Sequence, residues 1–503
     1  MQSVEKWGVF EVSCIGKTEG NPFVYYAVWG DFSGGQEQVR VRGFYDGNGI
    51  YKVRFMPMHE GGYHYRVSGT FSEDTYEGDF LVLPASEGNH GPVRVFGQYH
   101  FKYQDGTSYF PLGTTCYVWN LQNDELVSRT LKALRESPFN KIRFCIFPKH
   151  YVYNLGEPRS YPYEGTPMDS SVLTEENFDQ YTGNTELSNF DFSRFHTEHF
   201  RHIEYCINEL MSMGIEADLI LFHPYDRWGF SKMSKEQDAL FLKYVVARLA
   251  AYRNVWWAFA NEYDLMDKSH EDWKYYGELV QKEDPYQHLR SIHNCIKLYD
   301  HREEWITHCS IQRTDLYRTS ENTDEWRRTY QKPVVLDEIA YEGNIQYGWG
   351  NISGKELVRR YYEGICRGGY PQHGETFISA DHILWWSHGG TLKGESVPRI
   401  AFLRKLLEQS SVQGLKLWEK AAWDEVCGVP EKDEDPEYYL FYYGFMRPCV
   451  RNYHLKEEKS YRVRVIDTWN MTIEDRGTYS GSFNIDLPGR EYIAVEIQEG
   501  VHA

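Results

Sequence analysis

The sequence of 503 residues lacks any apolar run that approaches the roughly 18–20 residues of a membrane span. Its first residues contain no basic segment followed by an apolar stretch, so we expect no secretion signal. Cysteine is scarce: nine residues are scattered along the chain, and none of them form a Cys-x-x-Cys motif. This pattern disfavours both a disulfide framework and a zinc cluster. We therefore predict a cytoplasmic protein with reduced thiols and no membrane partner.

Basic residues are also few, with 54 Lys and Arg against 73 Asp and Glu and a formal net charge of −19. A nucleic-acid partner is disfavoured, because phosphate binding needs a basic face. The chain has no Gly-rich phosphate loop after a strand and no Gly-x-Ser-x-Gly elbow, so kinase and serine-hydrolase chemistries lack support. His199 and His202 have no His-Glu-x-x-His pattern around them, and we interpret them as surface histidines. The sequence thus predicts neither a metal nor a cofactor.

The length exceeds what one hydrophobic core supports and predicts several domains. Residues 1–95 alternate short strand-like runs with turns, including the Asp-Gly and Asn-Gly pairs of residues 46–49, which predicts a β-sandwich. Residues 415–503 return to this pattern and predict a second, smaller β-sandwich. The sandwiches either brace the middle domain or form an interface between copies, which leaves a homo-oligomer open.

Residues 96–414 alternate strands with helices. We expect helices at 124–136, 195–213 and 235–252, the last beginning with a Ser234/Gln237 capping box. Eight strands are expected, the last of them between Gly374 and Trp386; the other seven are 109–115, 141–147, 216–222, 255–262, 289–294, 305–312 and 333–340. This alternation of strands and helices predicts an α/β fold, a (β/α)8 barrel between the two sandwiches. The connection at 149–191, rich in Tyr, Pro, Gly and Asn, is predicted to form a wall of the binding site.

Two glutamates end two of these strands. Glu262 closes the fourth and Glu338 the seventh. Catalytic groups of such barrels lie at the carboxyl ends of the strands. A retaining glycosidase needs two carboxylates about 5–5.5 Å apart, one as nucleophile and one as acid/base. The preceding Asn261 is suited to bind the sugar 2-hydroxyl in the transition state.

The Asn261-Glu262 pair on strand four and Glu338 on strand seven resemble the large (β/α)8-barrel clan of retaining glycoside hydrolases. The N-terminal segments 21–23, 43–47 and 54–57 resemble the β-sandwich that precedes apiosidase-like barrels. This resemblance covers most of the chain and implies Glu262 as acid/base and Glu338 as nucleophile. It carries no substrate over, because related barrels cleave different linkages.

Other polar and aromatic residues at strand ends are candidates for substrate binding. Arg143 on strand two is expected to keep Glu338 ionised and lower its pKa. Where the clan often has a tyrosine on strand six, this chain has Gln312, which leaves the hydrogen-bond partner of the nucleophile open. Of the two adjacent tryptophans at the eighth strand, one is expected in the core and the other under the sugar. The full set of candidates is Asn261, Arg143, His223, His293, Asn294, Gln312, Trp119, Trp385 and Trp386.

The leading interpretation is an exo-acting retaining glycosidase for short oligosaccharides or glycosides. A non-catalytic carbohydrate-binding protein is the alternative from another class, and the presence of both glutamates argues against it. A transglycosylase would use the same site and differ only in the acceptor. An aldolase-type barrel would need a lysine at a strand end, and none of the predicted strand ends carries a convincing one.

Overall fold

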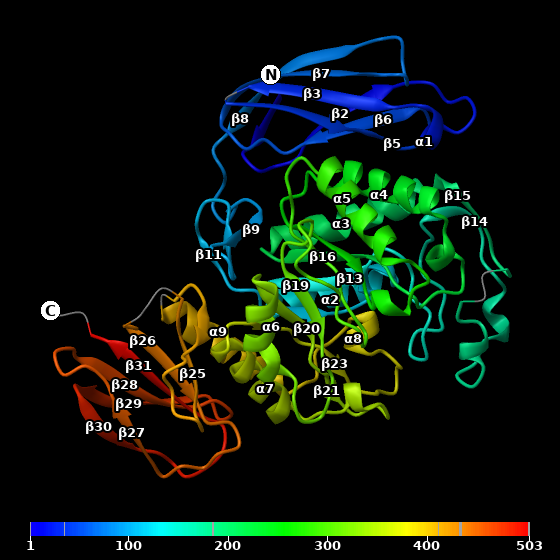
Figure 1. The fold of residues 1–503 in the computed structure, drawn as a ribbon. Helices are drawn as coiled ribbons and strands as arrows, with labels where there is room; N and C mark the ends of the chain where they lie inside the picture. The colour runs from blue at the N-terminus through cyan, green and yellow to red at the C-terminus, as the bar shows by residue number, and fades with distance from the viewer. Residues whose placement is uncertain (1, 35, 184–185, 411, 432–434, 501–503) are drawn as a thin grey trace.

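The computed structural model describes residues 2–34, 36–183, 186–410, 412–431 and 435–500. Strand-rich segments lie at both ends of the chain, and the middle of the chain alternates strands and helices around a central barrel (Figure 1).

The N-terminal segment forms a five-stranded sheet with the order β1-β8-β7-β3-β4 and a three-stranded sheet with the order β2-β6-β5. Its elements are β1 (Gln2–Glu5), β2 (Phe10–Ile15), α1 (Pro22–Tyr25), β3 (Val28–Gly34), β4 (Glu37–Arg42), β5 (Phe44–Tyr45), β6 (Ile50–Phe55), β7 (Gly61–Gly69) and β8 (Tyr76–Leu83). The predicted turn at residues 46–49 joins β5 to β6. Gly47, Asn48 and Gly49 all have positive φ there, which explains the glycines.

Aromatic rings join these two sheets. Phe10 of β2 stacks on Phe80 of β8 at 3.7 Å, and Phe32 of β3 stacks on Phe55 of β6 at 4.3 Å. Because these rings are fully or almost fully buried, this segment has a core of its own.

A small antiparallel sheet then covers the amino-terminal end of the barrel. It consists of β9 (Val93–Phe96), β10 (His100–Tyr103) and β11 (Ser108–Tyr109). Phe101 of β10 contacts Trp256, the second residue of one barrel strand, and Tyr370, the first residue of another. This end of the barrel is therefore filled by side chains, and the opposite end remains for a site.

Eight parallel strands form the barrel. They are β12 (Gly113–Thr115), β13 (Lys141–Cys145), β16 (Glu216–Phe222), β17 (Val255–Ala260), β18 (Arg290–Ser291), β19 (Cys309–Gln312), β20 (Val334–Glu338) and β22 (Tyr370–Pro371). Two single bridges close the circle, His293 with Ser310 and Thr114 with His373. The predicted (β/α)8 barrel is confirmed.

The expected helices also occur, with bounds shifted by a few residues. The barrel helices are α2 (Asp124–Glu136), α3 (Thr197–Ser212), α4 (Lys235–Leu249), α5 (His270–Glu283), α6 (Thr323–Tyr330), α7 (Gly354–Cys366), α8 (Trp385–His388) and α9 (Ser396–Gln409). The capping box of Ser234 and Gln237 begins α4 as predicted.

The expected position of the eighth strand was wrong. The strand is the pair Tyr370–Pro371, before the range expected, and Trp385 and Trp386 begin the helix α8 instead. A strand of two residues that includes proline gives no apolar run in the sequence. The prediction was therefore based on the apolar pair of tryptophans, which belongs to a helix. The neighbouring pairs β21 (Glu342–Gly343) and β23 (Glu375–Thr376) add a short ladder beside it.

The connection at 149–191 contains local structure. Its strand β14 (Tyr163–Thr166) pairs with β15 (Asn189–Phe195), and three-residue 3-10 helices lie at Ser170–Val172 and Phe178–Gln180. Tyr151 at its start contacts Tyr225 and Trp386, so the first part of the connection reaches the carboxyl end of the barrel.

The C-terminal segment forms a six-stranded sheet with the order β24-β25-β26-β31-β28-β29 and a separate pair, β27 with β30. Its strands are β24 (Leu415–Leu417), β25 (Val426–Pro430), β26 (Tyr438–Tyr442), β27 (Val450–His454), β28 (Tyr461–Asp467), β29 (Thr472–Tyr479), β30 (Ser482–Asp486) and β31 (Ile493–Glu499). Tyr442 of β26 stacks on Tyr362 of α7 at 4.9 Å, which attaches this sheet to the barrel.

Buried charges attach the N-terminal segment to the barrel. Arg54 of β6 donates hydrogen bonds to Glu204 of α3 at 2.7 and 2.9 Å, and the same carboxylate accepts one from Arg248 of α4 at 2.6 Å. Arg248 also bonds Asp46, which follows β5, at 2.8 Å. The side chains of these four residues are 9 % exposed or less, so each charge depends on its partners for compensation.

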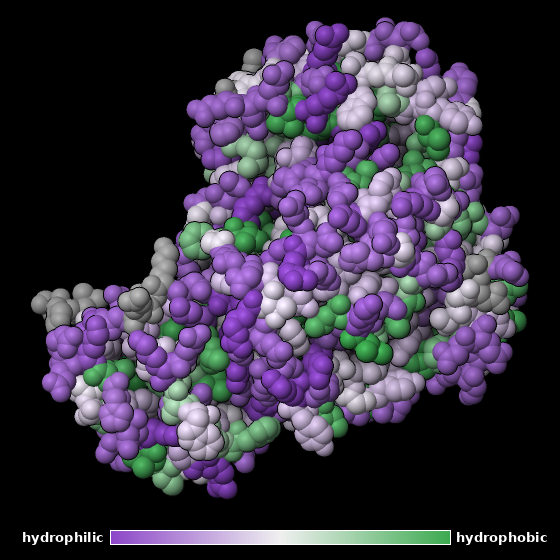
Figure 2. Space-filling model, viewed as in Figure 1, coloured by the Kyte–Doolittle hydropathy of each residue, from purple (hydrophilic) through white to green (hydrophobic). Residues whose placement is uncertain are grey.

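Hydrophilic side chains dominate the face shown in Figure 2, where hydrophobic ones form separate small patches. Among the described residues, no helix has both the length and the apolarity for crossing a membrane. All nine cysteines are unpaired in the structure.

Candidate active site

The two glutamates lie at the carboxyl end of the barrel. Glu262 is the second residue after β17, and Glu338 is the last residue of β20. Both are buried, with 6 % and 7 % of their surfaces exposed. Glu262 has left-handed backbone angles, φ 56° and ψ 58°, where the chain turns from the strand into the 3-10 helix Tyr263–Leu265. A non-glycine residue in this region carries backbone strain, which structures retain mainly at functional positions.

Asn261 and Arg143 connect the two carboxylates. The Asn261 amide nitrogen lies 3.3 Å from Glu262 Oε2, and its oxygen accepts a hydrogen bond from Arg143 at 2.7 Å. The same Arg143 nitrogen lies 3.6 Å from Glu338 Oε1. The structure therefore brings together the four residues that the sequence placed at the centre of the site.

Neutral donors surround Glu262. The Tyr225 hydroxyl donates to its Oε2, and the Gln312 amide donates to its Oε1 at 3.2 Å. Asn294 holds the Gln312 backbone through two hydrogen bonds of 3.1 Å each, so Asn294 positions Gln312 and not a carboxylate. Gln312 thus serves the predicted acid/base, and the partner of Glu338 has to come from elsewhere.

That partner is Tyr117, a residue the sequence reasoning missed. Its hydroxyl donates to Glu338 Oε1 and lies 3.0 Å from Asn261 Oδ1. Tyr117 comes two residues after β12, so a search of every strand end, including the first, would have found it. His293 Nε2 also lies 3.8 Å from Glu338 Oε1; burial lowers the pKa of His293 well below its usual range, so the ring is neutral.

Burial and the neighbouring Glu262 raise the pKa of Glu338 to about 7, and they outweigh the opposing effects of Arg143 and Tyr117. The expectation that Arg143 would leave Glu338 with a lowered pKa was therefore wrong in its net result, although Arg143 does act in that direction. With this pKa, Glu338 is partly protonated near neutral pH.

Lys149 is a second residue that sequence reasoning missed. It is 3 % exposed, and its ammonium lies 3.5, 4.2 and 4.6 Å from the ring centres of Tyr117, Tyr225 and Trp386. Among the described residues, this ammonium forms no ion pair with a carboxylate. Burial lowers its pKa to about 8, against the attraction of Glu262 and Glu338. The only signal in the sequence was its place four residues after β13.

The two adjacent tryptophans lie in different surroundings, one beside the site and one in the core. Trp386 is the one beside the site: its ring lies 5.3 Å from Tyr117, 5.9 Å from Tyr151 and 5.0 Å from Trp349. Trp385 is 2 % exposed and donates to Thr114 Oγ1 at 2.8 Å, so it is the core member of the pair.

Trp119 was predicted wrongly as a binding residue. Its side chain is fully buried and packs against Phe144, because the chain folds into the 3-10 helix Trp119–Leu121 directly after the barrel strand. A tryptophan after a strand end can face either the site or the helix layer, and the sequence does not distinguish these cases.

His223 and His199 are each held by a backbone carbonyl. His223 Nε2 bonds Phe147 O at 3.4 Å, and burial with the nearby Lys149 lowers its pKa to about 3, so it is neutral. Its role in substrate binding stays a prediction. His199, expected at the surface, is fully buried and bonds Ile146 O at 3.1 Å, because α3 packs this face on the barrel. No group of three or more potential ligands for a metal occurs among the described residues.

Comparison with known proteins gives three matches along the chain. Residues 97–421 match the apiosidase-like catalytic domain. Residues 3–70 and 423–498 match two domains of unknown function, DUF5060 and DUF5605. No curated protein matches significantly.

Solved structures agree with the domain match. A crystal structure from Bacteroides vulgatus that is assigned to the glycoside hydrolases is 36 % identical, with a TM-score of 0.90, and the alignment covers 99 % of this chain and 100 % of that one. A glycoside hydrolase family 5 protein from the same organism is 15 % identical, with a TM-score of 0.60, over 81 % of this chain and 93 % of its own. The second match supports the barrel fold alone.

The apiosidase-like match spans well over half of the chain and contains every residue of the site described above. Carbohydrate is accordingly the substrate class. The chain belongs to the apiosidase-like family, and it is a glycosidase that hydrolyses O-glycosyl bonds.

Proposed function

We propose that this glycosidase is a retaining, exo-acting enzyme for short oligosaccharides or glycosides. In this proposal Glu338 is the nucleophile and Glu262 the acid/base. The observation that carries it is the pair of buried carboxylates linked through Asn261 and Arg143 at the carboxyl end of the barrel. Double displacement by two carboxylates needs no metal or cofactor.

The surroundings of each carboxylate support its role. Arg143 is the cation next to Glu338 and favours the anionic form of this group, which a nucleophile needs. Glu338 attacks the anomeric carbon while Glu262 donates its proton to the departing oxygen. Glu262 then takes a proton from water, and the hydroxide oxygen displaces Glu338 from the anomeric carbon. Tyr117 holds the nucleophile by its hydrogen bond, and Asn261 is near enough to serve the sugar 2-hydroxyl.

Several wider features belong to this proposal. The two flanking segments are β-sandwich domains, supported in the N-terminal one by rings stacked between its two sheets. The unpaired cysteines support a reducing, cytoplasmic location. Light scattering of the full chain tests whether copies associate through these domains.

The test is hydrolysis of a panel of aryl glycosides by the wild type, Glu262→Ala and Glu338→Ala, each with and without azide. Both variants should lose at least about a thousandfold in activity. For a β-glycoside, azide should yield the β-glycosyl azide with Glu262→Ala and the α-glycosyl azide with Glu338→Ala. Asp267→Ala removes an exposed carboxylate from the segment after Glu262 and is the matched control, with unchanged activity.

Two results would contradict the proposal. If Glu338→Ala cleaves a substrate as fast as the wild type, the assignment of the nucleophile is wrong. If added sugars become the main acceptors in product analysis, the protein is a transglycosylase on the same site.

A further inference from the structure

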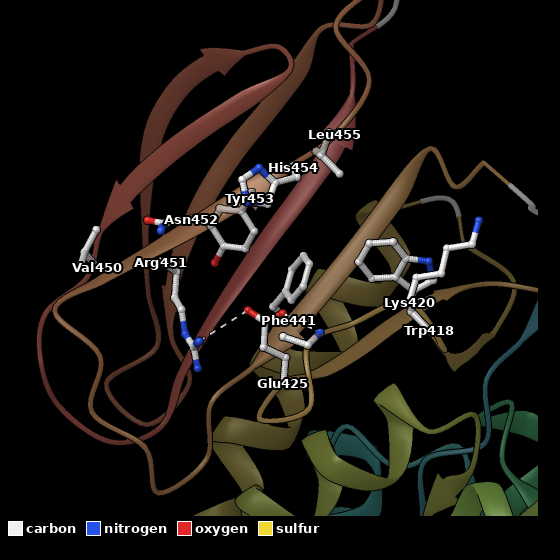
Figure 3. A pocket seen from close by; sticks show the side chains of 11 residues that line it. Trp418, Lys420, Glu425, Phe441, Val450, Arg451, Asn452, Tyr453, His454 and Leu455 are labelled. Atoms are coloured by element: carbon white, nitrogen blue, oxygen red, sulfur yellow. Dashed lines mark hydrogen bonds and ion pairs between the residues drawn. The ribbon is translucent and has the colours of Figure 1, made fainter.

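The C-terminal domain contains a cleft of about 460 Å³ that takes no part in the proposed reaction. It lies between β27 and the turn that leads from β24 into β25, with Phe441 of β26 between them (Figure 3). The catalytic residues, in contrast, lie on the barrel strands. The cleft is therefore a separate place where a ligand could bind.

Aromatic side chains form the floor and one wall of this cleft. Phe441 and Tyr453 pack together with ring centres 5.0 Å apart, and the Tyr453 hydroxyl is satisfied by the Tyr443 hydroxyl at 2.7 Å. Trp418 stands at the wall, half-buried, with Tyr439 behind it at 5.1 Å. Phe441 and Tyr453 are buried beneath the cleft, so Trp418 is the ring of this group that a ligand can reach, and the packing holds it in place before any ligand arrives.

Polar groups of both signs line the rest. Arg451 bonds Asp424 at 2.9 Å and lies 3.9 Å from Glu425, and Lys420 is on the opposite side. The lining has two cations, Lys420 and Arg451, and one carboxylate, Glu425. Asp424 lies outside the lining but bonds Arg451, so the charges at the cleft cancel formally and it favours no ionic ligand. The buried Arg451 Nε has no partner among the described residues, and Asn452 and His454 are exposed on β27. Donors and acceptors are thus both available beside the rings.

A second observation comes from the turn itself. Trp423 is 97 % exposed, the most exposed of the large hydrophobic side chains described. It lies between Ala422, which lines the cleft, and Asp424, which bonds Arg451. Tryptophan is usually well buried, and one held in water beside a cleft marks a surface where a ligand covers it.

We propose that this cleft, together with Trp423, binds a neutral carbohydrate chain as a second site outside the catalytic barrel. Sugar rings present flat C–H faces to aromatic side chains and hydroxyls that both donate and accept hydrogen bonds. A site with indoles, mixed donors and acceptors and no net charge matches both properties. Binding here gives the enzyme a second point of attachment to a carbohydrate.

The test uses the full chain with Glu338→Gln, which limits degradation of the probe if the proposed mechanism is right. Binding is measured without turnover, so its failure can be distinguished from failure of the proposed mechanism. Native gels contain a soluble neutral polysaccharide: a β-glucan, galactomannan, arabinoxylan, galactan or arabinan. At least one should slow the protein. Trp423→Ala should then raise the Kd at least about tenfold, and Trp418→Ala should have a similar effect.

Two controls separate binding from folding and from catalysis. Phe445→Ala removes another exposed ring of the same domain, one that contacts Arg359 of the barrel at 4.7 Å, and should leave retardation unchanged. Trp423 makes too little contact to be needed for folding, so Trp423→Ala keeps the proposal testable if Trp418→Ala unfolds. With Glu338 intact, Trp423→Ala should cleave a small aryl glycoside as fast as the wild type.

Three results would overturn the proposal. One is the absence of retardation by every polysaccharide in the panel. Another is retardation that persists unchanged in Trp423→Ala and Trp418→Ala. The third is a dimer that Trp423→Ala converts to a monomer in light scattering, because the occupant of the cleft would then be a second copy of this chain.

Discussion

Replacing Glu262 by glutamine should lower the pKa of Glu338. The pKa of Glu338 is raised to about 7 by burial and then by the negative charge of Glu262. Glutamine keeps the size of the side chain and removes its charge. Arg143 and Tyr117 remain in place and continue to stabilise the Glu338 anion.

The size of the change follows from Coulomb's law. Two charges about 5.5 Å apart, the spacing of a retaining pair, repel each other by about 3 kcal/mol at an effective dielectric constant of about 20. This energy corresponds to about two pH units. We therefore expect Glu338 in Glu262→Gln to titrate near pH 5.

The assay is the pH dependence of kcat/KM between pH 4 and 9. In the wild type, activity should fall on the acidic side with a midpoint near 7, where the proposed nucleophile Glu338 takes up a proton. A dinitrophenyl glycoside needs no acid for departure, so Glu262→Gln should cleave it with one acidic limb near pH 5 and no alkaline limb. If the acidic limb of the variant remains near 7, Glu262 does not act on Glu338 and the reasoning is refuted.

Three further changes test other contacts. Tyr117→Phe removes the hydrogen bond that lowers the pKa of Glu338, so the pKa should rise and kcat should fall about 10–100-fold, as a pH series of kcat would show. The pKa of Lys149 is about 8 in the folded protein against 10.5 when unperturbed, so stability should rise with pH between these values, where the unfolded chain binds more protons. Lys149→Met should remove this cost and increase the free energy of unfolding at pH 7 by up to about 3 kcal/mol while reducing activity; an unchanged urea midpoint would contradict it. Arg54→Met should cost about 3–5 kcal/mol because it removes one of the two cations that compensate the buried Glu204 and leaves Arg248 alone, whereas Arg66→Met, which breaks an exposed pair with Glu77, should cost less than about 1 kcal/mol in thermal melts.

The barrel could be predicted because its strands are buried on both faces. Val255–Ala260 and Glu216–Phe222 are continuous apolar runs, or nearly so, and the structure has them within a residue or two of the expected bounds. Tyr370–Pro371 could not be found in this way. It is tied into the barrel sheet by two ladder pairs with β20 and the bridge of the nearby His373 with Thr114, and none of these leaves a periodic pattern in the sequence.

The site shows the same division. Glu262, Glu338, Asn261 and Arg143 follow or occupy the ends of strands with clear patterns, so they could be assigned. Tyr117 and Lys149 also follow strand ends, but their roles depend on where the side chains point across the barrel mouth.

Direction is set by packing between elements distant in the chain. The Tyr117 hydroxyl meets Glu338, which is 221 residues away, and Trp119 turns the opposite way into the helix layer. Neither direction can be read from the local composition, which is why the roles of these two aromatic residues, only two positions apart, could not be predicted.

The charged cluster of Arg54, Asp46, Glu204 and Arg248 restricts how this protein can be recombined. An N-terminal domain from another protein should join this barrel stably only if it brings an acid and a base to the same two positions. Glu204 of α3 and Arg248 of α4 would otherwise keep their bond to each other but lose their buried partners Arg54 and Asp46. Domain exchange is therefore restricted by the cluster, because its four residues have to be transferred or replaced as a set. A chimaera that moves all four should fold, and one that moves only the domain should precipitate.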